Sequence, residues 1–267
     1  MGYGDALMAT GEVKLLRKKP DTKFVIGDGT RSYWSPIFDN NPFIIRGIQV
    51  KNFKDVIWVK NYEFNRPYRL YGKNLDPNNY NWNHNHKANP GELFFTNEEE
   101  SFAEKINSII INKYGKNKII FVEPHVKKRM GFENKDWGFH KWQEVINRFK
   151  DKYLFIQTTY GKREVLKNVI NFHGINFRYA CALMKITDLF IGTEGGMHHA
   201  AAALNKKAVV IFGGHISPDI TGYSFHKNLY ITDEFSPCGN KLKCKHCEEC
   251  LNKIKIEQLV NDIENQI

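Results

Sequence analysis

The stretch D-L-F-I-G-T-E-G-G-M-H-H-A-A-A, residues 188–202, decides the fold of this chain. An apolar strand at 189–191 ends in a glycine-containing turn, and an alanine-rich helix begins at Gly195 and Gly196. Glycines let main-chain amides approach an anion, and the first turn of a helix offers unpaired N–H groups at the positive end of its dipole. The stretch therefore predicts a diphosphate cradle at the carboxyl edge of a parallel sheet, or a strand-to-helix turn without a ligand.

Apolar strands alternate with helices on both sides of this stretch. We expect strands at 118–122, 153–156, 189–191 and 208–212, and helices at 139–149, 163–170, 179–185 and 197–204. Such alternation is typical of βαβ units, in which helices cover both faces of a parallel sheet. The second half of the chain is therefore predicted to be an α/β domain.

The first half has fewer strand signals. A helix is predicted at 6–18, with strands at 23–26 and 56–59. Thr96, followed by glutamates, predicts the N-cap of a helix that continues to about residue 113. The Asn-, Tyr-, His- and Pro-rich stretch at 62–90 has no periodicity, which is typical of a mobile segment or a binding loop. We place the domain boundary between an N-terminal domain, 1–115, and a C-terminal domain, 116–267.

Composition limits the function classes. The 267 residues carry 39 Lys and Arg against 29 Asp and Glu, a net charge of +10, and 42% of them are hydrophobic. This content supports a folded core and excludes disordered and fibrous classes. No apolar run reaches the roughly 20 residues of a spanning helix, and the N-terminus lacks the features of a secretory signal. We therefore expect a cytoplasmic protein with anionic partners: nucleotides, phosphorylated glycans, nucleic acid or an acidic membrane surface.

Four cysteines gather near the C-terminus: Cys238, Cys244, Cys247 and Cys250. Thiols stay reduced in the cytosol, so this cluster favours a metal over a disulfide. Zn²⁺ accepts four thiolates in tetrahedral geometry, and His246 can replace one sulfur. A structural zinc site is therefore one interpretation; reduced thiols, an iron–sulfur cluster and a disulfide remain as alternatives.

Residues 188–214 resemble the donor-site signature of glycosyltransferase family 9, the ADP-heptose:lipopolysaccharide heptosyltransferases. In that signature an apolar strand leads into Asp-Thr-Gly, two further residues and His, and an alanine-rich helix then leads to a strand ending in Phe-Gly. Here His199 matches the histidine, and the strand at 208–212 ends in the same way. The chain departs from the family where Glu194 stands in place of Asp and Gly195 in place of Thr.

Other segments resemble family elements in the same order along the chain. Gly4 and Asp5 match the glycine–aspartate loop at the family's first helix, and Lys135 with Trp137 matches a Lys-x-Trp element of the second domain. The cysteine-rich stretch resembles one that precedes the family's final helix. The N-terminal half is shorter than is typical, and residues 62–90 match no family element.

The resemblance implies a GT-B fold, in which two Rossmann-like parallel-sheet domains face a cleft, here with a reduced N-terminal domain. It implies an inverting glycosyltransferase that moves a heptose-like sugar from a nucleotide diphosphate, with ADP favoured, to an anionic glycan such as a lipopolysaccharide core. No D-x-D motif occurs in the chain, so no cofactor is expected for catalysis, and protein groups must meet the charge of the leaving diphosphate. Such an acceptor places the protein at the inner face of the membrane.

The resemblance also implies roles for particular side chains. Asp5 is the expected catalytic base for the acceptor hydroxyl, and helix capping is its alternative role. A lysine, a histidine ring and main-chain amides would stabilise the diphosphate. Separately, by analogy with the acid of dinucleotide-binding folds, Glu164 would accept hydrogen bonds from ribose hydroxyls. The expected donor-binding residues are Lys135, Glu164, Glu194, Gly195, Gly196, Met197 and His199.

Two other functions stay open. A transferase that acts on modified nucleic acid would use the basic surface and the aromatic side chains of the 62–90 stretch, which are Tyr62, Tyr68, Tyr71, Tyr80 and Trp82. Binding of that kind would depend strongly on salt, because phosphate contacts release counterions. A non-catalytic relative that binds a nucleotide or a metal would explain the shortened start and the Glu194 departure.

Overall fold

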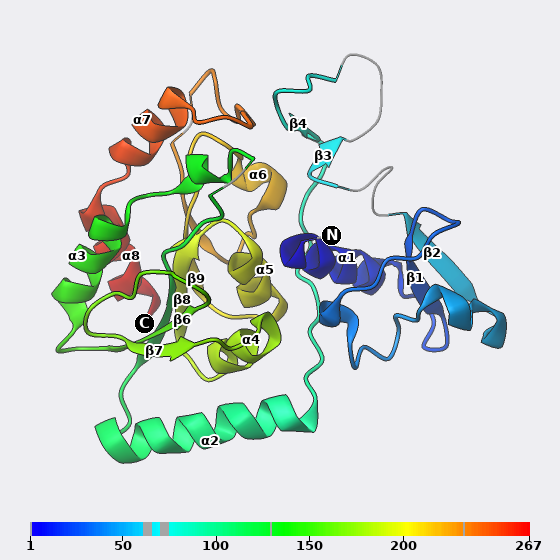
Figure 1. Cartoon of the computed structure of the whole chain (residues 1–267), viewed down its shortest axis with the longest axis horizontal. Helices are drawn as coiled ribbons and strands as arrows, with labels where there is room; N and C mark the ends of the chain where they lie inside the picture. Colours follow the sequence, from blue (N-terminus) through cyan, green and yellow to red (C-terminus); the bar gives the residue numbers. More distant parts are fainter. Residues whose placement is uncertain (1, 61–65, 70–74, 129, 232) are drawn as a thin grey trace.

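The computed structural model describes residues 2–60, 66–69, 75–128, 130–231 and 233–267. Two lobes lie side by side, a larger one built on a single sheet and a smaller one around the N-terminal helix (Figure 1). Among the helices of these ranges, none combines the length and hydrophobicity that crossing a lipid bilayer requires.

The larger lobe contains a six-stranded sheet in the order β10-β9-β8-β5-β6-β7, with every neighbouring pair parallel. Its strands are β5 (Ile119–Glu123), β6 (Leu154–Thr159), β7 (Ile170–His173), β8 (Leu189–Thr193), β9 (Ala208–Ile211) and β10 (Lys227–Leu229). The chain runs outward from β5 in one direction and from β8 in the other, so the strand order reverses between these two strands. Open α/β sheets bind their ligands at the carboxyl ends of the strands at such a point.

Helices cover both faces of this sheet, as the alternating pattern predicts. The helices α3 (Phe139–Phe149) and α8 (Ile256–Gln266) pack on one face, and α4 (Phe177–Lys185) and α5 (Gly196–Ala203) pack on the other. In α3 the buried side chains recur at helical spacing, at Trp142, Val145, Ile146 and Phe149. The central strands β5 and β8 are mainly apolar because both faces of the sheet are covered.

The smaller lobe is reduced, as expected. It contains α1 (Tyr3–Leu16) and a parallel pair, β1 (Lys23–Gly27) and β2 (Val56–Lys60), followed by a short antiparallel pair, β3 (Tyr68–Arg69) and β4 (Asn81–Trp82). Two 3₁₀ turns, η1 (Pro36–Phe38) and η2 (Gly47–Asn52), lie between β1 and β2. The helix α1 packs against α5 of the larger lobe, so the two lobes share one hydrophobic core.

The helix α2 (Asn97–Tyr114) connects the lobes. Thr96 caps it as predicted, because the Thr96 hydroxyl accepts a hydrogen bond from the main chain of Glu99 at 3.3 Å, and Gly115 ends it with a φ of 77°. This helix packs against α4 of the larger lobe. The predicted boundary after residue 115 assigns α2 to the N-terminal domain, whereas α2 packs against the larger, C-terminal lobe. The domain boundary therefore remains a prediction.

The prediction of a helix at 163–170 is wrong. The segment is irregular up to β7, and side chains from other elements bind its main-chain N–H groups: Gln157 accepts from Leu166 at 2.9 Å, and Gln143 accepts from Lys167 at 2.7 Å. Asn168 is in the left-handed region, with a φ of 62°. The C-terminal part adds α6 (Pro218–Thr221) and α7 (Lys245–Lys253), which apolar periodicity alone does not predict.

Candidate functional site

The Gly195 and Gly196 pair begins α5 at the carboxyl end of β8, where the strand order reverses. Neither residue has a side chain that covers the first turn of the helix. A Cβ atom placed on Gly196 would lie 3.3 Å from the Phe177 ring and 3.7 Å from the main-chain nitrogen of Gly4. The first turn of α5 therefore faces the first turn of α1 across the two lobes.

The Gly4 residue permits this close approach from the other side. A Cβ atom on Gly4 would lie only 2.9 Å from Cδ2 of His199 and 3.5 Å from Cα of Gly196. The N-terminal turns of α1 and α5 are therefore in close contact at Gly4 and Gly196.

The Lys135 and Glu194 side chains form a buried ion pair beside this junction. Lys135, from η3 (Phe132–Lys135), donates to Oε2 of Glu194 at 2.7 Å, and Nε2 of His199 lies 3.5 Å from Oε1. Burial alone would raise the pKa of Glu194, but the Lys135 ammonium and His199 hold it well below its usual range. Glu194 is therefore ionised, and Lys135 neutralises its charge.

Two further histidine features border the site. Nδ1 of His199 lies 2.8 Å from the Tyr223 hydroxyl. His198 is fully buried, with no hydrogen-bond partner for either ring nitrogen among the described residues, and burial together with His199 lowers its pKa well below the usual value. Glu194, His198 and His199 lie close enough to hold a metal ion, but the carboxylate is already neutralised by Lys135.

Asp5 is the third residue of α1, at the same end as Gly4. Its Oδ2 accepts a hydrogen bond from the Gly2 main chain at 3.1 Å, so it does cap the helix. The Tyr68 hydroxyl lies 3.5 Å from Oδ1, and Arg66 donates to that hydroxyl at 3.0 Å. The half-buried carboxylate thus lies near the lobe junction, and its role as a base stays a prediction.

The structure does not bring Glu164 into this group. Its side chain is exposed, and its main-chain oxygen lies 2.8 Å from Nε2 of His125 and accepts a hydrogen bond from Gln157 at 3.2 Å. A carboxylate that the sequence reasoning missed, Glu123, lies at the end of β5 instead, 3.9 Å from Arg163, and burial raises its pKa to about 7. Its position at the end of a central strand was the available signal.

The cysteine cluster divides into two groups. Cys238, Cys244 and Cys247 lie together with His246, with Sγ–Sγ distances from Cys238 of 3.9 Å to Cys244 and 3.1 Å to Cys247. Cys250 instead lies 3.3 Å from Oδ2 of Asp233. His246 belongs to both groups, because its Nε2 also lies 3.4 Å from Sγ of Cys250.

The aromatic side chains of the 62–90 stretch pack within the protein. Tyr80 and Trp82 stack with ring centroids 5.3 Å apart, and the Trp82 indole donates to the main-chain oxygen of His215 at 3.0 Å. The ring of Tyr68 packs edge-on against both of them. Tyr62 and Tyr71 lie outside the described residues. The described aromatic rings therefore serve to join the lobes, which weakens their proposed use in nucleic-acid binding.

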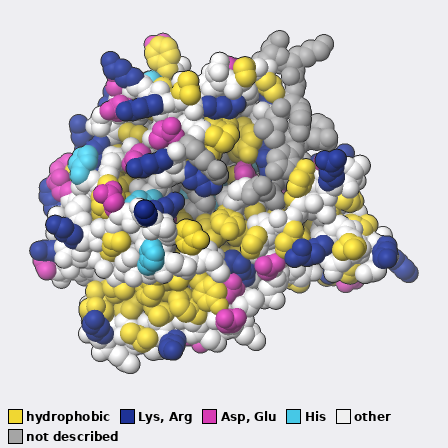
Figure 2. Space-filling view, in the orientation of Figure 1, with side chains coloured by type: hydrophobic (Ala, Val, Ile, Leu, Met, Phe, Trp, Pro, Cys, Tyr) yellow, Lys and Arg dark blue, Asp and Glu magenta, His cyan; other side chains and the backbone are white. Residues whose placement is uncertain are grey.

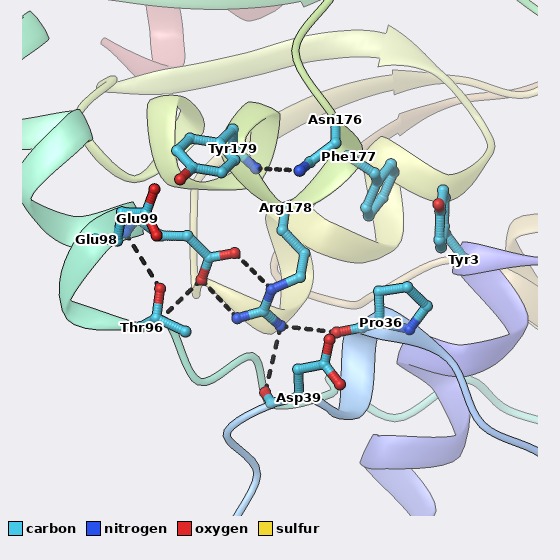
Figure 3. Close-up of a pocket in the computed structure, with 10 residues that line it drawn as sticks. All are labelled: Tyr3, Pro36, Asp39, Thr96, Glu98, Glu99, Asn176, Phe177, Arg178 and Tyr179. Atoms are coloured by element: carbon cyan, nitrogen blue, oxygen red, sulfur yellow. Dashed lines mark hydrogen bonds and ion pairs between the residues drawn. The ribbon is translucent and has the colours of Figure 1, made fainter.

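A pocket of about 300 Å³ lies where α1, η1, α2 and α4 meet (Figure 3). The buried Arg178 side chain crosses it and binds both oxygens of Glu99, each at 2.6 Å. Sequence reasoning missed both residues, because nothing in the local pattern of either helix indicates a partner 79 positions away.

Solved heptosyltransferase structures resemble this chain over nearly its whole length. E. coli ADP-heptose lps heptosyltransferase II is 14% identical with a TM-score of 0.63, covering 99% of this chain and 96% of that chain. The family 9 glycosyl transferase of Veillonella parvula DSM 2008 is also 14% identical, with a TM-score of 0.66 and coverages of 100% and 94%. E. coli heptosyltransferase WaaC with ADP-2-deoxy-2-fluoro heptose is 13% identical, with a TM-score of 0.54 and coverages of 100% and 98%. These likenesses confirm the GT-B fold.

Comparison at the level of sequence adds the family. No curated protein matches the chain. The family model for glycosyltransferase family 9 (heptosyltransferase) matches residues 79–255, which is more than half of the chain. The match includes the 188–214 stretch. The chain is therefore a glycosyltransferase and belongs to glycosyltransferase family 9 (heptosyltransferase).

Proposed function

We propose that this protein is an inverting heptosyltransferase that moves a heptose-like sugar from an ADP-linked donor to a lipopolysaccharide core. Two similar structures support the donor class, since one is named an ADP-heptose lps heptosyltransferase and another holds ADP-2-deoxy-2-fluoro heptose. The observation that carries the proposal is the meeting of the α1 and α5 N-termini at Gly4 and Gly196, beside Lys135 and His199.

In this proposal the larger lobe holds the donor diphosphate. The main-chain amides of Gly195, Gly196 and Met197 point to the phosphates, together with the His199 ring and the Lys135 ammonium. Glu194 holds Lys135 through one N–H, which leaves other donors of the ammonium for a phosphate oxygen. Fixed donors of this kind stabilise the charge of the leaving group without reorganisation.

Asp5 acts as the base on the acceptor hydroxyl. The smaller lobe brings it to the junction, and the Gly2 amide orients its carboxylate. A single base with direct displacement gives inversion at the anomeric carbon. The position of the carboxylate is the main requirement, because proton transfer needs hydrogen-bond reach first and a suitable pKa second.

Two variants test these roles. Asp5→Asn should abolish transfer from ADP-heptose but leave ADP binding intact, whereas Asp21→Asn, an exposed control, should change neither. Gly196→Val should weaken ADP binding, as measured by calorimetry, because the valine side chain would contact Phe177 and Gly4. Near-normal turnover of Asp5→Asn would remove the base assignment, and unchanged ADP affinity of Gly196→Val would remove the cradle. A wild-type protein that binds ADP but turns over no nucleotide sugar would favour the non-catalytic alternative.

We also propose that Cys238, Cys244, Cys247 and His246 hold a structural zinc ion. Tetrahedral zinc with thiolate bonds of about 2.3 Å places sulfurs about 3.8 Å apart. The Cys238–Cys244 distance of 3.9 Å matches this spacing, and Cys247, 3.1 Å from Cys238, would have to move outward by about 0.7 Å to bind the ion. Cys250 is placed outside this set, because its Sγ lies 3.3 Å from Oδ2 of Asp233. The ion would fix the loop that carries Cys238.

Metal analysis tests this set. Wild-type protein purified under reducing conditions should contain one zinc per chain, and Cys244→Ser should lose it. Cys181→Ser, at a buried cysteine far from the cluster in sequence, is the control. Loss of zinc from Cys250→Ser but not from His246→Ala would replace the histidine by the fourth cysteine.

The proposed acceptor is membrane-linked, so we further propose that the protein works on the cytoplasmic side, in peripheral contact with an acidic lipid surface. Its net charge of +10 favours such contact. Figure 2 shows Lys and Arg spread over the visible face and interleaved with Asp and Glu. Cosedimentation with vesicles that contain phosphatidylglycerol should therefore decrease with salt, and equal binding to neutral vesicles would contradict this contact.

A further inference from the structure

Arg178 touches more segments of the protein than its place in α4 requires. Beyond Glu99, its guanidinium donates to main-chain oxygens of Pro36 at 3.0 Å and Asp39 at 3.4 Å (Figure 3). It also donates to the main-chain oxygen of Phe94 at 2.6 Å. Pro36 and Asp39 belong to the smaller lobe, Phe94 to the connection between lobes, and Arg178 itself to the larger lobe. One side chain therefore joins three parts of the chain.

The Arg178–Glu99 pair is fixed in a single geometry. Both side chains are buried, and a forked guanidinium meets a carboxylate through two hydrogen bonds of 2.6 Å. Burial alone would raise the pKa of Glu99, but its bonds to Arg178 lower it, so the carboxylate is charged. The Glu99 carboxylate is also fixed from its own helix, because the Thr96 main chain donates to Oε2 at 2.9 Å. Buried ion pairs contribute little net stability, and their best-attested use is to specify one arrangement.

This pair lies next to the proposed active site. Phe177, the residue before Arg178, stacks on Tyr3 with ring centroids 4.5 Å apart and an interplanar angle of 25°. Figure 3 shows the two rings facing each other beside Arg178. Phe177 also borders Gly196, and Tyr3 precedes Gly4, which borders His199. The contacts of Arg178 are thus continuous with the meeting point of α1 and α5.

We propose that Arg178 is a positioning residue for glycosyl transfer, which sets the distance between the Asp5 end of α1 and the Gly196 end of α5. The inference rests on the proposed function, since it takes those two ends as the base and the donor cradle. Arg178 contacts neither reactant. It acts by holding η1 and the 94–99 segment of the chain against α4.

A positioning role predicts a particular kinetic pattern. The proposed donor-binding groups all lie in the larger lobe, so ADP binding does not need the lobes to be aligned. Transfer does need alignment, because displacing a base by about 1 Å can cost a hundredfold in rate. Loss of Arg178 should therefore reduce kcat and leave the donor KM nearly unchanged.

The test uses Arg178→Lys, which keeps the charge beside Glu99 but cannot reach three carbonyl groups at once. The matched control is Lys185→Met, because Lys185 and Glu100 pair at 2.7 Å between the same two helices, α4 and α2, on the exposed surface. Each full-length variant is measured for ADP affinity by calorimetry, for kcat and KM with ADP-heptose and a heptose-deficient lipopolysaccharide, and for thermal unfolding. Tyr3→Ala is the second variant. It removes the stacking of Tyr3 on Phe177 from the smaller lobe without removing a buried charge.

We expect Arg178→Lys to lower kcat at least about tenfold while ADP affinity and donor KM change less than about threefold. Tyr3→Ala should also lower kcat, and Lys185→Met should leave kcat, ADP affinity and donor KM unchanged. An unchanged kcat in a folded Arg178→Lys protein, or an equal loss in Lys185→Met, overturns the positioning role. Failure of the proposed function would be seen separately, as wild-type protein without transfer activity.

Discussion

Lys135 and Glu194 show how one pair of side chains connects stability with the donor site. The pair is 10% and 6% exposed, so neither charge is solvated well without the other. The same ammonium is the proposed ligand of the diphosphate. The lysine was predictable because a Lys-x-Trp element precedes a helix at the expected place in the chain. Its partner was not, because Glu194 is 59 residues away and replaces the family's aspartate.

We predict that Lys135→Met destabilises the protein by about 3–5 kcal/mol, the usual cost of leaving a buried charge unpaired. Urea unfolding at neutral pH measures this loss. The control is Lys118→Met, whose pair with Asp188 is 55% and 33% exposed and should cost less than about 1 kcal/mol. Equal losses in the two variants would show that Glu194 does not depend on Lys135.

Two buried histidines should make stability depend on pH. Burial lowers the pKa of His86 and of His226 to about 4, whereas an unfolded chain titrates near pH 6.5. Between these values the unfolded state binds more protons, so the free energy of unfolding should fall as the pH falls from about 6.5 to about 4.

Urea unfolding at pH 7.5, 6 and 5 tests this dependence. We expect His86→Gln and His226→Gln each to flatten it, while His84→Gln, at an exposed position of the same segment as His86, leaves it unchanged. A wild-type stability that does not vary between pH 7.5 and 5 would contradict the burial of neutral rings.

At the scale of elements, the sequence predicts what depends on local pattern and fails where a distant side chain decides. The strand at 118–122 and the helix at 139–149 were predictable from apolar spacing, and the start of α2 from its Thr96 cap. The segment at 163–170 reads as a helix but is not one, because Gln157 and Gln143 bind its N–H groups from β6 and α3. The cysteine spacing likewise indicates a metal cluster but not that His246 lies among Cys238, Cys244 and Cys247 while Cys250 lies beside Asp233.

Gln157 should therefore support the irregular 160–169 segment. It is fully buried and binds the Leu166 amide at 2.9 Å and the Glu164 carbonyl at 3.2 Å. We predict that Gln157→Leu costs about 1–3 kcal/mol by leaving these groups unpaired. Hydrogen exchange should become faster within 160–169 and stay unchanged in α2. Unchanged exchange in the segment would mean that it is held by other contacts.

At the scale of the whole molecule, the sequence indicates two lobes but not how they meet. The parallel sheet of the larger lobe was predictable from the alternation of strands and helices, and the GT-B arrangement only from the resemblance to family 9. The contacts that join the lobes were not: the Gly4 approach to His199, the Arg178 bonds to η1, and the packing of residues 76–82, here called the strap, on the cysteine-rich loop. Each depends on residues far apart in the chain, with no periodic pattern to reveal them.

The strap links the cysteine cluster to the lobe junction. The Tyr80 amide donates to the main-chain oxygen of Gly239, the residue after Cys238, at 2.7 Å. The Lys241 amide donates to the main-chain oxygen of Asn78 at 3.0 Å. Trp82 at the end of the strap pairs across the β3–β4 ladder with Tyr68, whose hydroxyl faces Asp5. If the cluster holds zinc, losing the ion should release the loop and then the strap.

We therefore predict that Cys244→Ser, or zinc removal by a chelator, speeds hydrogen exchange in the strap and lowers transfer activity, although no cysteine lies at the donor site. Exchange in β1 should stay unchanged, because that strand pairs with β2 and does not contact the loop. Cys181→Ser should affect neither region. If exchange in the strap stays at its wild-type rate after zinc is lost, the strap is held by its aromatic packing alone, and the cluster serves only its own loop.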